Sequence, residues 1–142
     1  MAHYPLDHHL RQPYRLLAAA SGLYMTVAGL LGVAASWGES FFGHGSDWAL
    51  GLRFNPAGAW LSTLAGLAVL AAAALGGNVH HRVSMVLGWA LMAVAMVVLA
   101  AIQTDANFLN VSMVNVIVLA LLGLFVLTAG LYGQVRTAGN RG

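Results

Sequence analysis

The sequence contains no cysteine and no lysine, and it carries few charges of either sign. Without cysteine the chain cannot use disulfides, thiolate catalysis, iron–sulfur clusters or cysteine-based zinc sites. Only 7% of the 142 residues are charged, whereas a soluble domain carries about 25%. The six basic residues are all arginine and form no cluster that would neutralise several phosphates, so no nucleic-acid partner is expected.

Four long apolar runs contain none of these charges, and they cover residues 16–35, 57–76, 83–102 and 113–132. A helix rises about 1.5 Å per residue, so about 20 apolar residues cross the hydrocarbon core of a bilayer. The pieces between the runs are too short for a second domain. The sequence therefore predicts an all-α integral membrane four-helix bundle, a single domain over residues 1–142 with the lipid bilayer as its first partner.

The arginines are distributed unevenly around these spans. Only Arg53 lies between spans one and two, and the others share the side of the termini and the second loop: Arg11, Arg15, Arg82, Arg136 and Arg141. The positive-inside rule then predicts that both termini are cytoplasmic. The first run also fits a signal peptide, but it is long for a signal h-region, so we expect the first helix to be retained. The all-arginine composition is typical of a GC-rich bacterial genome, which favours a bacterial plasma membrane.

The loop between the first two spans is the longest and is rich in aromatic residues. Tryptophan prefers the headgroup zone of a membrane, and glycines here break any long helix. We expect a loop with a short helical turn on the outer interface. The predicted interface anchors are Trp37, Phe41, Phe42 and Trp48 on this side, with Arg15 and Arg82 on the other.

Three histidines, His3, His8 and His9, lie within seven residues of the N-terminal segment. Such a tract can bind a transition metal. A short, solvated and partly disordered tail accounts for the same residues. No metal site is therefore predicted, and these histidines stand as its only candidates.

The remaining histidines lie between the predicted spans. His80 and His81 belong to residues 77–82, which we predict to be a tight cytoplasmic turn, and His44 lies near Asp47 in the first outer loop. These three histidines are the candidates for binding a cofactor. Because none falls within a predicted span, haem held between helices is not expected, and no cofactor is predicted.

Small residues recur every four positions in the first two spans: Ala18, Gly22 and Thr26, then Gly58, Ser62 and Gly66. Helices in a bilayer gain little from the hydrophobic effect, so close approach of small residues holds them together. We expect a close crossing of these two helices, with a dimerisation face as the alternative. Asn115, in the first turn of the fourth span, is expected to cap its helix or to bond across helices, at about 1 kcal/mol.

The two halves of the chain repeat weakly. Phe-Asn-Pro-Ala at 54–57 leads into the second span, and Leu-Asn-Val-Ser at 109–112 leads into the fourth. Each half is an outgoing helix, an outer loop ending in a hydrophobic–Asn step, and a returning helix. Both halves start on the cytoplasmic side, so the predicted repeat is parallel, with its axis along the membrane normal.

This layout, with the closing Leu-Thr-Ala-Gly-Leu at 127–131, resembles the DUF4383 family of small four-helix bacterial membrane proteins. The resemblance covers most of the chain, from Tyr14 to Leu131, and implies the same topology, with no assigned biochemical activity. Family members often carry a histidine in the Asn-initiated helices, where this chain has Ser62 or Thr63 and Val118. The chain departs from the pattern at the position most readily identified with a site.

No acid–base pair, nucleophile dyad, cofactor motif or phosphate loop is positioned to act, so no enzyme and no catalytic residue is expected. The sequence favours a non-catalytic accessory or structural subunit that packs against other membrane-protein subunits, or against itself, in a larger complex such as a respiratory or photosynthetic one. A small oligomeric transporter or channel is one alternative. A protein that binds haem, quinone or a pigment is another.

Overall fold

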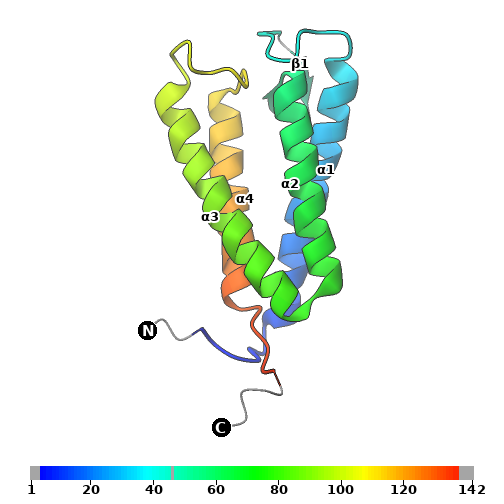
Figure 1. The fold of residues 1–142 in the computed structure, drawn as a ribbon, viewed down its shortest axis with the longest axis vertical. Helices are drawn as coiled ribbons and strands as arrows, with labels where there is room; N and C mark the ends of the chain where they lie inside the picture. Colours follow the sequence, from blue (N-terminus) through cyan, green and yellow to red (C-terminus); the bar gives the residue numbers. More distant parts are fainter. Residues whose placement is uncertain (1–3, 46, 138–142) are drawn as a thin grey trace.

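The computed structural model describes residues 4–45 and 47–137, in which four helices form two hairpins (Figure 1). The helices are α1 (Arg11–Ala35), α2 (Pro56–Leu75), α3 (Gly77–Ala101) and α4 (Met113–Leu131). All four are long and apolar enough to cross a membrane. The prediction of a helical chain with four helices of membrane-spanning length is confirmed.

Two helices begin earlier than the apolar runs predict. α1 begins at residue 11 rather than 16, and α3 begins at residue 77 rather than 83. An apolar run marks what fits in hydrocarbon, whereas helical hydrogen bonding continues into polar residues. Pro13 is accommodated in the first turn of α1, where its missing N–H has no helical partner. The predicted turn at residues 77–82 is therefore wrong, because the break between α2 and α3 is reduced to Gly76, whose φ is +69°.

The long loop between α1 and α2 contains an antiparallel β-hairpin instead of the predicted helical turn. Strand β1 (Asp47–Ala49) pairs with β2 (Leu52–Phe54). Leu50 and Gly51 connect the strands, both with positive φ, as a two-residue hairpin turn of the mirror-image type requires. Alternate strand residues pack on the ends of α1 and α2 in one buried cluster: Ala28, Ala49, Leu52, Phe54 and Ala59. The cross-strand pairing provides local hydrogen bonds that a single helical turn could not supply over this length.

Each helical hairpin is packed through glycines. A Cβ atom added at Gly29 of α1 would lie 2.6 Å from the backbone nitrogen of Thr63 in α2. A Cβ atom at Gly88 of α3 would lie 2.5 Å from the backbone nitrogen of Leu127 in α4. The backbones of α1 and α2, and those of α3 and α4, are therefore in direct contact.

The two hairpins lie side by side and run in the same direction, so α1 and α3 both start at the end where the termini lie (Figure 1). Contacts between the hairpins are sparser than contacts within them. Near the termini they share a buried cluster from α1, α2 and α4: Ala18, Val69, Val126 and Ala129. Toward the loops, α2 and α3 diverge (Figure 1).

Candidate functional site: a lateral apolar groove

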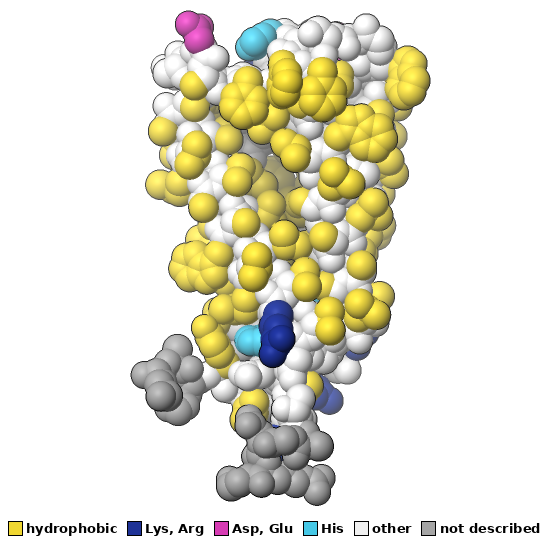
Figure 2. Space-filling model, viewed as in Figure 1, with side chains coloured by type: hydrophobic (Ala, Val, Ile, Leu, Met, Phe, Trp, Pro, Cys, Tyr) yellow, Lys and Arg dark blue, Asp and Glu magenta, His cyan; other side chains and the backbone are white. Residues whose placement is uncertain are grey.

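An apolar groove with a volume of about 280 Å³ lies between the hairpins where α2 and α3 diverge. Figure 2 shows it as a hollow between the two halves of the surface, in the half nearer the loops. Its α2 wall presents Gly58, Ser62 and Ala65, and its α3 wall presents Ala90 and Val94. Leu61 also lines the α2 wall and Leu87 and Leu91 the α3 wall, so the groove is apolar on both sides, with more of its small residues on α2. It opens sideways.

The few polar groups of the groove are already bonded. The Ser62 hydroxyl donates to the Met25 carbonyl at 2.8 Å. The side chain of Asn115 accepts from the backbone N–H of Arg53 at 2.9 Å and donates to the Arg53 carbonyl at 2.8 Å. Among the described residues that line the groove, none is histidine or charged. An occupant would therefore meet mostly apolar surface, and the one lining side chain of a type that ligates haem iron, Met25, is 3% exposed.

Arg53 and two asparagines close the groove at its loop end. The Arg53 guanidinium donates to the Asn110 carbonyl at 2.8 Å and to the next carbonyl along the chain at 3.1 Å. Fully buried Asn55 accepts from Gly58 N–H at 2.8 Å and donates to the Phe108 carbonyl at 2.8 Å. These bonds join the two loops. The sequence marks Arg53 only as the arginine on the opposite side of the spans, because no local pattern identifies a partner 57 residues away.

The two Asn steps of the predicted repeat have different roles. Asn55 is the N-cap of α2. The N-cap of α4 is Ser112, which forms a capping box with Asn115. Asn110 instead has a φ of +52° and donates a side-chain hydrogen bond to the Gly45 carbonyl. The start of the returning helix is thus capped in both halves, but the capping residue is offset from the repeated asparagine, and Asn115 both caps α4 and bonds across to β2.

The predicted packing residues face different neighbours. Four of them lie where α1 packs on other helices, and on α2 above all: Ala18, Gly22, Thr26 and Gly66. A Cβ at Gly22 would lie 2.9 Å from the Gly66 carbonyl, so this stripe is covered within the chain and is not a free dimerisation face. Gly58 lies outside that contact and lines the groove. Ser62 lies at the boundary between the two.

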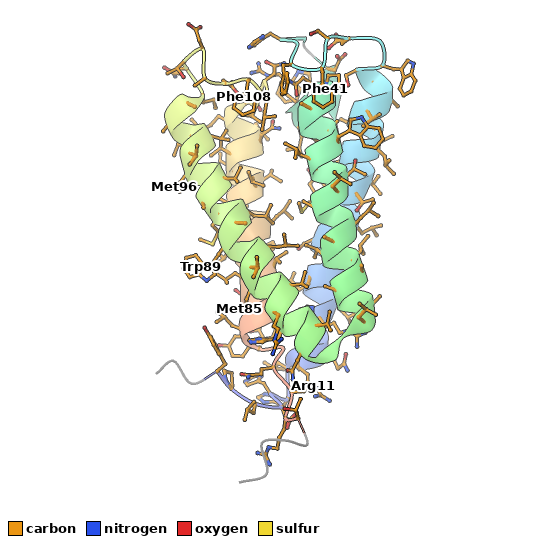
Figure 3. The ribbon with its side chains drawn as sticks, in the orientation of Figure 1. Arg11, Phe41, Met85, Trp89, Met96 and Phe108 are labelled. Carbon is orange, nitrogen blue, oxygen red and sulfur yellow. The ribbon has the colours of Figure 1, made fainter. Side chains whose placement is uncertain are left out.

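The predicted aromatic anchors are all exposed around the loop end of the bundle. Trp37 is 81% exposed, and about half of the surface of Phe41, Phe42 and Trp48 is accessible. The Phe42 ring packs edge-on against Phe108 of the other loop, with centroids 5.9 Å apart. Figure 3 labels Phe41 and Phe108 on either side of this end.

The two predicted arginine anchors differ in their contacts. Arg82 is exposed on α3. Arg15 instead donates from Nε to the Ala73 carbonyl and from Nη2 to the Ala74 carbonyl, the latter at 2.8 Å. These carbonyls lie in the last turn of α2, where no helical N–H reaches them. Arg15 therefore caps the C-terminal end of α2, a role separate from the predicted one as an interface anchor.

His80 and His81 lie in the first turns of α3, so the prediction that they belong to a turn between two helices is wrong. Only 2% of His80 is exposed. Its Nδ1 lies 3.1 Å from Ser84 Oγ, and its buried Nε2 has no hydrogen-bond partner. His81 Nδ1 lies 2.7 Å from the Gly130 carbonyl. The early start of α3 carries both rings into the contact with α4.

The other described histidines, His8, His9 and His44, lie at or near the surface. His44 is exposed in the first loop. The rings of His8 and His9 stack 4.5 Å apart, and His3 lies outside the described residues. Within residues 4–45 and 47–137, no three side chains of His, Asp or Glu group closely enough to hold a metal ion. The segment is not simply a solvated tail, because the Asp7 N–H donates to the Gln134 carbonyl at 3.0 Å.

Comparison of the chain with family models, with curated proteins and with solved structures gives no match in any of the three. The resemblance to the DUF4383 family accordingly stays a prediction. The function must be argued from the groove and from the polar groups of this chain.

Proposed function

We propose that this chain is a non-catalytic, multi-pass membrane protein that serves as an accessory subunit and receives a transmembrane helix of a partner subunit in the groove between α2 and α3. The partly buried small residues that the α2 wall presents to the groove, Gly58, Ser62 and Ala65, carry the proposal. In a bilayer, helices associate where small residues let their backbones approach. The equivalent small residues of α1 are already covered inside the chain.

α3 is the least covered of the four helices, and its exposed surface includes a face that the groove does not reach. In the most apolar stretch of α3, 22% of the residues are buried within the chain, against 44% in α1. Trp89 and Met96 are mostly exposed, and Figure 3 shows them pointing away from the other helices. A partner helix seated in the groove would cover part of α3 as well as the α2 wall.

We further propose that the protein lies in a bacterial plasma membrane with both termini in the cytoplasm. The argument is the positive-inside rule applied to the arginines. α1 and α3 start and α4 ends at one end of the bundle, so Arg11, Arg15, Arg82 and Arg136 gather there (Figure 1). Because the four arginines lie at the same end of the bundle, they support the same assignment of that end to the cytoplasmic side.

A transporter or channel is the less favoured alternative. Four hydroxyl groups within the helices each donate to the carbonyl one turn earlier in the same helix: Ser21, Thr26, Thr63 and Thr128. Pores are usually lined by polar groups that face a shared path. In the described part of the chain these hydroxyls are used locally and line no such path.

Gentle detergent extraction of the native membrane, followed by native electrophoresis and mass spectrometry, tests the accessory role. We expect the wild-type protein to migrate with a larger membrane complex. Ala90→Trp fills the groove and should weaken that association about tenfold, which corresponds to about 1.4 kcal/mol. Ala93→Trp is the matched control, because Ala93 is an equally exposed alanine of α3 that does not line the groove.

Migration of the wild-type protein alone would contradict the proposal. Equal retention of both tryptophan variants in the complex would place the partner elsewhere on the surface. If Ala90→Trp displaces a co-purified lipid and no protein, the occupant of the groove is an acyl chain and the accessory role fails.

A further inference from the structure

A second pocket, which unlike the groove has charged and polar side chains among its walls, lies at the opposite end of the bundle from the loops. Its volume is about 210 Å³. It lies where the chain ends approach the α2–α3 turn, near Arg11 in Figure 3. Its walls include Arg11, Gln12 and Arg15 of α1, with Gly77 and His80 of α3. It shares no residue with the groove, so its role can be separated from the one proposed above.

His80 is the buried member of this pocket. It is 2% exposed, and its Nε2 has no hydrogen-bond partner. The Ala129 carbonyl lies close to the ring but outside hydrogen-bond geometry. A Cβ at Gly133, another residue of the pocket wall, would lie 3.4 Å from Nε2. A buried polar atom without a partner is costly, which points to a missing acceptor or donor on this side.

The hydrogen bond between Ser84 and His80 indicates whether the missing partner of Nε2 is an acceptor or a donor. Ser84 is fully buried, and its hydroxyl lies at hydrogen-bond distance, 3.1 Å, from His80 Nδ1. A buried hydroxyl must place its proton on an acceptor, and Nδ1 is the acceptor in reach. Ser84 therefore donates to Nδ1, and the ring proton resides on Nε2. His80 then carries an N–H donor without an acceptor, and a ligand in the pocket reaches it only when the pocket wall at Gly133 shifts, because Nε2 has almost no accessible surface.

The charges around the pocket are also suited to an acceptor. Arg15 donates from Nε and Nη2 to two carbonyl groups. These neutral acceptors do not neutralise its positive charge, and Nη1 takes no part in the two hydrogen bonds. Arg11 pairs with Asp7 at 3.3 Å, where both side chains are nearly half exposed. Gly77 begins α3, whose first N–H groups lack helical partners and form the positive end of the helix dipole. The Asp7 carboxylate, which pairs with Arg11, is negative and partly offsets the positive charge around the pocket.

We propose that this pocket binds a phosphate group, either that of an anionic lipid headgroup or that of a small soluble phosphate. The guanidinium groups of Arg11 and Arg15 supply the charge, and the Nε2–H of His80 becomes the inner donor when the pocket wall shifts to expose it. Phosphate oxygens accept several such charge-assisted hydrogen bonds at once. Helix N-termini favour the same kind of anion.

Thermal unfolding of the full-length protein in dodecyl maltoside, followed by tryptophan fluorescence, tests the site. The two probes are inorganic phosphate and dihexanoyl phosphatidylglycerol, a short-chain lipid. We expect a saturable rise in Tm with at least one of them. A rise with both means that the phosphate group suffices, a rise with the lipid alone identifies a headgroup site, and a rise with phosphate alone identifies a soluble ligand.

Arg11→Gln should weaken the binding about tenfold, because it removes one charge-assisted contact. Arg82→Gln is the matched control, since Arg82 is an exposed arginine near the same end of α3 that does not line the pocket. Because His80→Ala removes a buried side chain and can unfold the protein, His80 is examined in place by ¹⁵N NMR. We expect the Nε2–H tautomer and a shift of its resonance on binding.

Three results would each overturn the proposal. The first is the absence of a saturable Tm rise with either probe. The second is equal binding by Arg11→Gln and Arg82→Gln. The third is a ring proton on Nδ1, which would leave Nε2 without a hydrogen to donate.

Discussion

Contacts within each helical hairpin differ in kind from contacts between the hairpins. Within a hairpin, backbone meets backbone through glycine, as at Gly29 of α1 and Gly88 of α3. Between hairpins, side chains meet instead, in a mid-bundle cluster of Met25, Leu91 and Leu122. The glycine contacts leave no space, whereas the junction leaves a groove of about 280 Å³. Each hairpin is therefore the tightly packed unit, and the junction is where another molecule has room.

The junction is nevertheless held at both ends. At the loop end, Asn115 of α4 bonds to the backbone of Arg53. The Arg53 guanidinium in turn donates to the Asn110 carbonyl in the loop between α3 and α4. At the other end, Gly76 alone separates α2 from α3, and Ala18 and Val69 of the first hairpin share a buried cluster with residues of α4. The groove is thus a gap in side-chain packing between two fastened ends.

Gly29→Ala should give the largest effect on this comparison. The new Cβ would lie 2.6 Å from Thr63 N and 2.7 Å from the Ala59 carbonyl, both backbone atoms, so α1 and α2 must separate. Overpacking of this kind costs about 1–3 kcal/mol, and we expect the upper end in the free energy of unfolding. Reversible unfolding in mixed detergent measures it.

Gly58→Ala is the control for that substitution. Its Cβ would face the groove and lie 3.3 Å from Asn55 Oδ1, so a loss within about 0.5 kcal/mol is expected. Equal losses for the two alanine variants would show that the hairpin contact is no tighter than the junction.

Asn115→Ala should have the next largest effect, at the junction itself. It leaves the N–H and carbonyl of Arg53 without partners, and buried groups left in this way cost about 1–3 kcal/mol. We expect the hairpins to separate at the loop end. Because the chain has no cysteine, spin labels attached to cysteines introduced at Leu61 and Val94, on opposite walls of the groove, report the distance directly.

Asn107→Ala is the matched control, because the Asn107 side chain bonds only to residues of its own loop, Ile102 and Val111. It should loosen that loop and leave the distance across the groove unchanged. An unchanged distance in Asn115→Ala as well would mean that Asn115 does not fasten the hairpins.

The smallest expected effect concerns Glu39, in the first loop. Partial desolvation and the nearby Asp47 carboxylate raise the pKa of Glu39 above its ordinary value of 4.5. A raised pKa stabilises the folded loop below pH 4.5, and this contribution is lost as the pH rises through the raised pKa. Fluorescence of Trp48, with the other tryptophans replaced by phenylalanine, should therefore follow loop opening on going to neutral pH.

Glu39→Gln should flatten that titration, because glutamine keeps the side chain neutral. Asp105→Asn, in the other loop, should leave it unchanged. A titration that persists in Glu39→Gln would assign the effect to another group.

The sequence predicts the helices well and their polar contacts poorly, for one physical reason. The α4 prediction, residues 113–132, ends one residue from the observed helix, because an apolar run bounded by polar residues is a local signal. The α3 prediction starts six residues late, since it assigns residues 77–82 to a turn. Because of that error, the prediction placed His80 in a surface loop, whereas His80 is a buried residue of the bundle.

By itself, the sequence determined the four apolar helices, their C-terminal ends to within one residue and the absence of charge within their apolar runs, because each of these follows from residues adjacent in the chain. The tertiary structure alone decided which polar groups are already bonded and which are left over. Asn115 and Arg53 satisfy one another across 62 positions, whereas His80 Nε2 is buried with no partner. Hydrogen bonds and burial depend on the partner that folding brings near, and no local pattern names that partner.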